Sequence, residues 1–84
     1  MEIPQINKLS GTNPNDLLKD YLRAREAIQK AIDVVAGVWP HGRDYQQGSI
    51  QKAMHEHAER CKSLRQVMAE LETIAEGILN QMGS

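Results

Sequence analysis

A short segment near the middle of the chain gathers the side chains best suited to bind another molecule. They are, in chain order, Trp39, His41, Arg43, Asp44 and Tyr45, and we call them the loop set. For a planar phosphorylated ligand, Arg43 would pair with the phosphate while Trp39 or Tyr45 stacks on the base. A protein partner is the competing prediction, because Arg and aromatic residues dominate binding hot spots. A structural role, in which the two aromatic rings plug the end of a hairpin, is the third alternative.

His57 and Cys61 are the other candidates for chemistry, because a spacing of four places both side chains on one face of a helix. The pair can supply two zinc ligands, or a thiol and its general base. A zinc site needs further ligands, and only His41 remains as a third nitrogen. No other group orients the imidazole, and no oxyanion donors are evident. The sequence therefore predicts no catalytic residue, metal or cofactor, with a metal-dependent enzyme as the least favoured alternative.

The charged residues are balanced in sign, with 10 basic and 11 acidic residues and a formal net charge of −1. This composition lacks the basic patch of a nucleic-acid binder. Lys19, Arg23 and Arg25 can bind a phosphate group, although a solvated helix face is the simpler interpretation. Cys61 is the single cysteine, and no apolar run is long enough for a membrane span or a signal peptide. We therefore expect a cytoplasmic protein that binds neither nucleic acid nor membrane.

The first helix is predicted to begin at Pro14, with Asn13 as its N-cap. Apolar residues then recur at spacings of three and four, which is typical of one helix face. One row is Leu17, Tyr21, Ala24, Ile28, Ala31, Val35 and Val38, and a second row beside it is Leu18, Leu22, Ile32, Ala36 and Trp39. Gly37 and Pro40 disfavour continuation, so this helix is expected to span about 14–39.

A longer helix is predicted over about 50–82, after a loop at 40–48 that is rich in Gly, Pro and Asp. Ser49 is the expected N-cap. The apolar row of this helix alternates between spacings of four and three without a break. It consists of Ile50, Met54, His57, Cys61, Leu64, Met68, Leu71, Ala75, Ile78 and Met82.

These elements predict an all-α fold: an antiparallel helix-loop-helix hairpin domain over 14–82, preceded by an extended arm at 1–13. Two helices leave much of both apolar faces in water, so we expect a homo-oligomer, as a four-helix bundle or a larger assembly. The expected interface residues are Met54, His57, Cys61, Leu64, Met68, Leu71 and Ile78. The alternative is a monomer whose N-terminal arm covers the exposed face.

The loop resembles a segment of small uncharacterised bacteriophage and prophage proteins, in which a His- or Asn-Gly-Arg-Asp-Tyr sequence joins two helices. The residues that carry the resemblance are His41-Gly42-Arg43-Asp44-Tyr45, then Ala53, Glu56, His57, Arg60 and Leu64. The resemblance implies a phage accessory protein, of a kind that blocks a host system by binding a defence protein or by sequestering its nucleotide signal. It assigns no role to an individual residue.

The expected function is therefore that of a small non-enzymatic accessory binding protein in the host-cell cytoplasm. It would present the loop set to a host protein or to a small phosphorylated, nucleotide-like ligand. The alternative is a structural or adaptor protein whose helical row engages another helical protein. The residues expected for that contact are Met54, Met68, Leu71 and Ile78.

Overall fold

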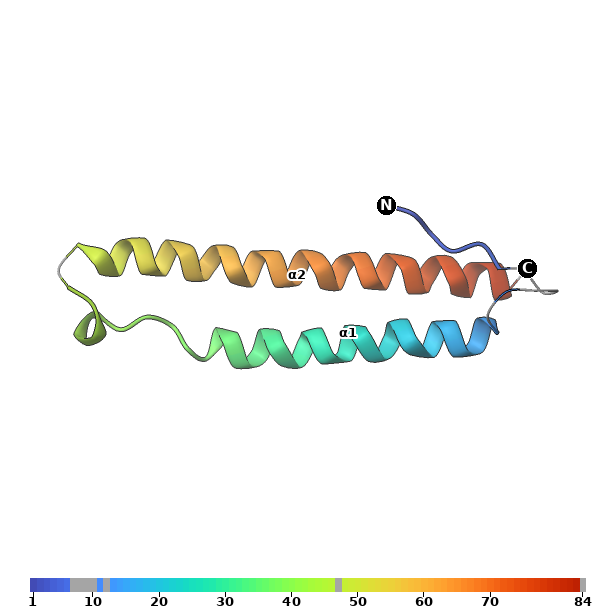
Figure 1. The fold of residues 1–84 in the computed structure, drawn as a ribbon, viewed down its shortest axis with the longest axis horizontal. Helices are drawn as coiled ribbons and strands as arrows, with labels where there is room; N and C mark the ends of the chain where they lie inside the picture. The colour runs from blue at the N-terminus through green and yellow to red at the C-terminus, as the bar shows by residue number, and fades with distance from the viewer. Residues whose placement is uncertain (7–10, 12, 47, 84) are drawn as a thin grey trace.

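The protein is a long hairpin of two antiparallel helices, seen in the computed structural model of the chain (Figure 1). Helix α1 spans Pro14–Ala36, a 3₁₀ turn (η1) spans Gly42–Asp44, and helix α2 spans Ser49–Met82. The molecule measures 61 × 20 × 19 Å. The predicted all-α helix-loop-helix hairpin is therefore confirmed.

The structure describes residues 1–6, 11, 13–46 and 48–83. Residues 7–10 and 12 of the predicted arm, and residue 47 of the predicted loop, lie outside the described residues.

Helix α1 begins at the residue that the capping signals predict. The Asn13 side chain accepts a 2.8 Å hydrogen bond from the backbone N–H of Asn15. Pro14 occupies the first helical position, where a backbone N–H would have no helical partner. Both features satisfy or remove donors that a helix start leaves unpaired.

The end of α1 differs from the prediction, because the helix stops at Ala36 rather than near residue 39. Gly37 caps the helix, and its backbone N–H donates to the carbonyl of Val34 at 3.1 Å. The next N–H, that of Val38, donates to the carbonyl of Val35 at 3.1 Å. Glycine is a poor helix former, so the last turn tightens and closes there. The chain that follows is free to leave the helix axis before it reaches the loop.

The start of α2 corrects a second prediction, because Ser49 is the first helical residue and not the N-cap. The cap is Gly48, whose φ of 93° lies in the left-handed region that glycine adopts without strain. The Ser49 N–H donates to the carbonyl of Gln46 at 2.9 Å. A backbone turn, and not the serine hydroxyl, therefore leads the chain into α2.

The interior of the protein is a single seam between α1 and α2. Its buried residues are Ile32, His57, Cys61, Ala75 and Ile78. The predicted row of α2 forms one side of the seam, since every member is buried or half-buried except Met54, which is 44% exposed. The inward side of α1 lies between its two predicted rows, because Ile32 of the second row is buried while Ala24 and Val38 of the first row are exposed.

The N-terminal arm lies along the C-terminal part of α2 (Figure 1). The Gln81 Oε1 atom accepts a hydrogen bond from the Ile6 N–H, and its Nε2 donates to the Pro4 carbonyl, both at 2.8 Å. Ile3 packs over Gly77, where a Cβ atom would come within 2.5 Å of the Ile3 Cγ2. The side-chain amide of Gln81 and the lack of a Cβ atom at Gly77 together allow the extended arm to pack against α2.

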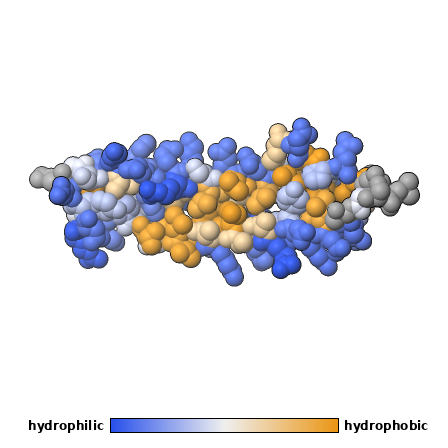
Figure 2. Space-filling view, in the orientation of Figure 1, coloured by the Kyte–Doolittle hydropathy of each residue, from blue (hydrophilic) through white to orange (hydrophobic). Residues whose placement is uncertain are grey.

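Apolar side chains still reach the surface over much of the face drawn in Figure 2. The large exposed ones include Met1, Leu22, Val34, Val38, Met54, Val67 and Leu79. No helix in the described part of the chain is long and apolar enough to cross a membrane.

Replacing Gln81 by Met tests the docking of the arm. The variant keeps a helix-forming side chain of similar length but loses both hydrogen bonds to the arm. Each bond contributes about 0.5–1.5 kcal/mol net, so the arm should detach while the hairpin stays folded. We expect the Ile6 amide to exchange with deuterium as fast as in an unfolded peptide. Asn80→Met, at the exposed neighbouring position, is the control and should leave that amide protected.

Candidate functional site

A ring contact at the base of the loop holds the loop against the helical seam. The centroids of the Trp39 indole and the His57 imidazole lie 4.5 Å apart, with planes tilted by 56°. Tilted rings at this separation attract each other beyond the area that they bury. On its other side, the His57 Nε2 lies 3.7 Å from the Cys61 Sγ. Trp39 therefore contacts one member of a buried pair, in which His57 is 3% exposed and Cys61 is 4% exposed.

The backbone beyond Trp39 is ordered by short-range hydrogen bonds. The Asp44 N–H donates to the His41 carbonyl at 3.0 Å, and the Tyr45 N–H donates to the Gly42 carbonyl at 3.3 Å. These bonds close the η1 turn, which the sequence did not predict. The turn places the rest of the loop set on the end of the hairpin.

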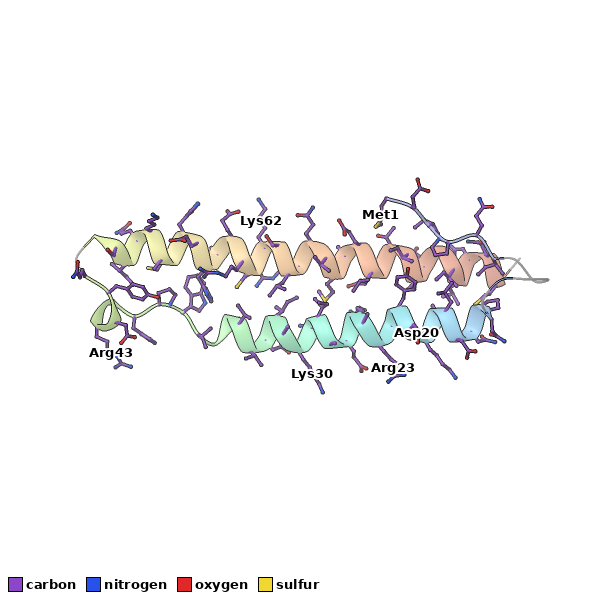
Figure 3. The ribbon with its side chains drawn as sticks, viewed as in Figure 1. Met1, Asp20, Arg23, Lys30, Arg43 and Lys62 are labelled. Carbon is purple, nitrogen blue, oxygen red and sulfur yellow. The ribbon has the colours of Figure 1, made fainter. Side chains whose placement is uncertain are left out.

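The other four members of the loop set face solvent. His41, Arg43 and Asp44 are exposed, and Tyr45 is 44% exposed. Figure 3 shows Arg43 projecting away from both helices. Within the described part of the chain, none of these four side chains makes a hydrogen bond or an ion pair. Trp39 is itself 45% exposed, so all five members of the loop set reach solvent, and Trp39 is the member with a ring contact in the described structure.

The buried pair of His57 and Cys61 lacks the further ligands of a metal centre. Among the described residues, no group of three or more His, Cys, Asp or Glu side chains is placed to hold a metal ion. His41, the third nitrogen considered from the sequence, lies in the exposed loop. The arrangement is that of a packed thiol and imidazole, with an indole against the imidazole.

A cavity of about 330 Å³ lies at the basic group of α1. It is lined by Lys19, Leu22, Arg23, Arg25 and Glu26. The Arg25 Nε atom is already paired with the Glu72 Oε1 at 3.2 Å, and Glu26 adds a negative charge to the lining. Arg23 points away from α2 (Figure 3). The cations predicted as a phosphate site are therefore partly neutralised within the protein.

A second cavity of about 290 Å³ is a groove between the helices, which the sequence reasoning did not identify as a site. Its lining consists of Leu18, Leu22, Arg25, Glu72, Ala75, Glu76 and Leu79. Leu22 is 46% exposed and Leu79 is 55% exposed. The second apolar row of α1 was the available signal, but the partner of that row on α2 depends on the register of the two helices.

The residues expected at an oligomer interface lie largely within one chain. His57, Cys61 and Ile78 are buried in the seam. The half-buried members are Leu64, Met68 and Leu71, and Met54 is the most exposed. Their role in an assembly stays a prediction, and the surface open to another molecule lies beside them.

Comparisons of the chain with protein-family models, with curated proteins and with solved structures found no match. The site is therefore interpreted from its own geometry.

Replacing Trp39 by Ala tests the anchoring of the loop. Removing the indole should expose the Cys61 thiol, which is 4% exposed under the Trp39–His57 contact. We expect the thiol to react with an aromatic disulfide reagent at least tenfold faster, since reactivity follows access. Tyr45→Ala is the matched control, because it removes an aromatic ring of the same loop that has no ring contact in the described structure. Equal rates in the two variants would contradict the anchoring role.

Proposed function

We propose that the protein is a non-enzymatic accessory binding protein that presents the exposed members of the loop set to a protein partner. The observation that carries this proposal is the anchored base of the loop. Trp39, although 45% exposed, packs on buried His57, and Arg43 and Tyr45 face solvent from an ordered turn. A loop held in place before binding loses less conformational entropy when a partner binds.

The shape of this end favours a protein partner over a small ligand. Sites for small molecules are concave and bury most of the ligand surface. The two cavities of about 330 and 290 Å³ lie along the helices, and no loop-set residue lines either of them. An exposed arginine and tyrosine on a projecting turn are instead typical anchors of protein interfaces.

The resemblance of the loop to phage and prophage proteins indicates what kind of partner the proposal implies. The partner would be a host protein in the bacterial cytoplasm, which a homo-oligomer of hairpins blocks by binding. Sequestration of a nucleotide-like signal is the competing form of the same proposal. It would use the Arg43 guanidinium for phosphate and the Tyr45 ring for the base.

An adaptor function is the second candidate, and the exposed apolar side chains along both helices favour it. Leu22, Val34 and Leu79 remain exposed after the hairpin has formed. Such side chains on a helical surface fit another helical protein. The contact would lie on the outer faces of the hairpin, because Ile78 is fully buried and Met68 and Leu71 are half-buried in the single chain.

The proposal is tested by the double variant Arg43→Ala/Tyr45→Ala in partner capture from a bacterial lysate, followed by titration of the purified partner. Hot-spot residues contribute about 2 kcal/mol each, so the double variant should bind at least thirtyfold more weakly. Arg23→Ala, which removes an exposed arginine far from the loop, is the control and should bind like the wild type.

Native mass spectrometry of the same preparations separates the competing forms. A partner bound equally by the wild type and the double variant would contradict presentation by the loop. If the wild type retains an added mass of nucleotide size and Arg43→Ala does not, the result would contradict a protein partner and favour a nucleotide-like ligand. A partner lost in Val34→Ala but kept by the double variant would favour the adaptor.

A further inference from the structure

We infer that the groove lined by Leu18, Leu22 and Leu79 is the contact surface for a second copy of this chain, which packs with its loop at the same end. This inference goes beyond the proposed function and does not depend on what the loop binds. It rests on the exposed area, on the residues of the groove and on the order of charges along its two sides.

The chain exposes more surface than a compact monomer of its mass. Its accessible surface is 6525 Å², whereas the scaling of folded monomers predicts about 5000 Å² for 9.4 kDa. The excess of about 1500 Å² exceeds the roughly 800 Å² per partner that a stable interface buries. One dimer contact along the hairpin is therefore enough to bring the exposed area to the ordinary range.

The groove has the composition of an interface core. Leu22 and Leu79, on opposite helices, are each about half exposed, and Leu18 and Ala75 lie between them. The salt bridge between Arg25 and Glu72 crosses the groove next to these residues. A concave apolar floor beside a closed ion pair can accept the leucines of a second copy, provided that Glu76, the other charged residue of the lining, finds a cation on that copy.

The charges beside the groove change sign along each helix. On α1, the row at spacings of three and four contains Lys19 toward the N-terminal end, then Glu26 and Asp33 toward the loop. On α2, the corresponding row contains Arg65 toward the loop, then Glu72 and Glu76 toward the C-terminal end. Each helix therefore carries opposite charges at the two ends of the groove side.

The register of the hairpin places opposite signs at equal heights. Arg25 faces Glu72 in the antiparallel pair, so Lys19 lies near the height of Glu76, and Asp33 lies near that of Arg65. A two-fold axis parallel to the helices sets α1 of one copy against α2 of the other at unchanged heights. Lys19 then meets Glu76 of the partner subunit, and the leucine-lined grooves face each other.

The alternative two-fold arrangement brings like charges together at its centre, although Lys19 would lie near the height of Asp33 of the partner subunit. An axis perpendicular to the helices at the level of the groove sets α1 against α1 and α2 against α2. Arg25 then approaches Arg25 of the partner subunit, and Glu72 approaches Glu72 of the partner subunit, which is repulsive. The central charges, Arg25 and Glu72, thus favour the dimer whose two loops lie at one end, where both can engage the same partner.

The surface is tested by sedimentation equilibrium of the wild type and two variants of α1. Leu22→Glu places a charge in the groove, whereas Val34→Glu places the same charge at a 70% exposed position that does not line it. Because both positions are exposed in one chain, both variants should keep the helical content of the wild type by circular dichroism. We expect a dimer for the wild type and Val34→Glu, and a monomer for Leu22→Glu. A monomeric wild type, a dimeric Leu22→Glu or a monomeric Val34→Glu overturns the inference.

The arrangement is tested by exchanging one pair of charges. Lys19→Glu and Glu76→Lys should each weaken the dimer by about tenfold or more, since each opposes two charges of the same sign. The double variant Lys19→Glu/Glu76→Lys restores opposite signs and should return the dissociation constant to near that of the wild type. If the double variant is weaker than both single variants, the two loops do not lie at the same end.

Discussion

Two helices can bury only one side of each other, and this limit governs the whole molecule. The apolar row of α2, from Ile50 to Met82, lies along the single seam with α1. Among the described residues only five are buried, and Ile78 alone is shielded completely from water. The outer sides of both helices are therefore left outside the seam. The N-terminal arm packs on one side of α2, and the groove beside Leu22 and Leu79 lies on another.

The seam also fixes what the loop can present. Its loop end is closed by His57 and Cys61, and Trp39, three residues after the end of α1, packs on His57. The indole stays 45% exposed in this contact, so the loop presents the Trp39 and Tyr45 rings together with its polar groups. This end of the hairpin is suited to contact the surface of another protein, because the two cavities lie along the helices and not at the loop.

The sequence predicted the hairpin because helix periodicity and capping are local properties. The predictions of the Asn13 cap and of the α2 row were correct for this reason. The predicted end of α1 was wrong because Gly37 closes the last turn early. The contact of Trp39 with His57 and the grip of Gln81 on the arm could not be predicted. Both join residues distant in sequence, so they depend on the register of the helices and the path of the chain. The groove was missed for the same reason.

The most direct test of this account is a nuclear Overhauser measurement between the Trp39 indole protons and the His57 imidazole protons. A sample that mixes isotope-labelled and unlabelled chains separates contacts within a chain from contacts between chains. The account predicts a strong effect within one chain, in keeping with the 4.5 Å between the ring centroids. The absence of that effect, or its presence only between chains, would contradict a loop anchored on the seam of its own hairpin.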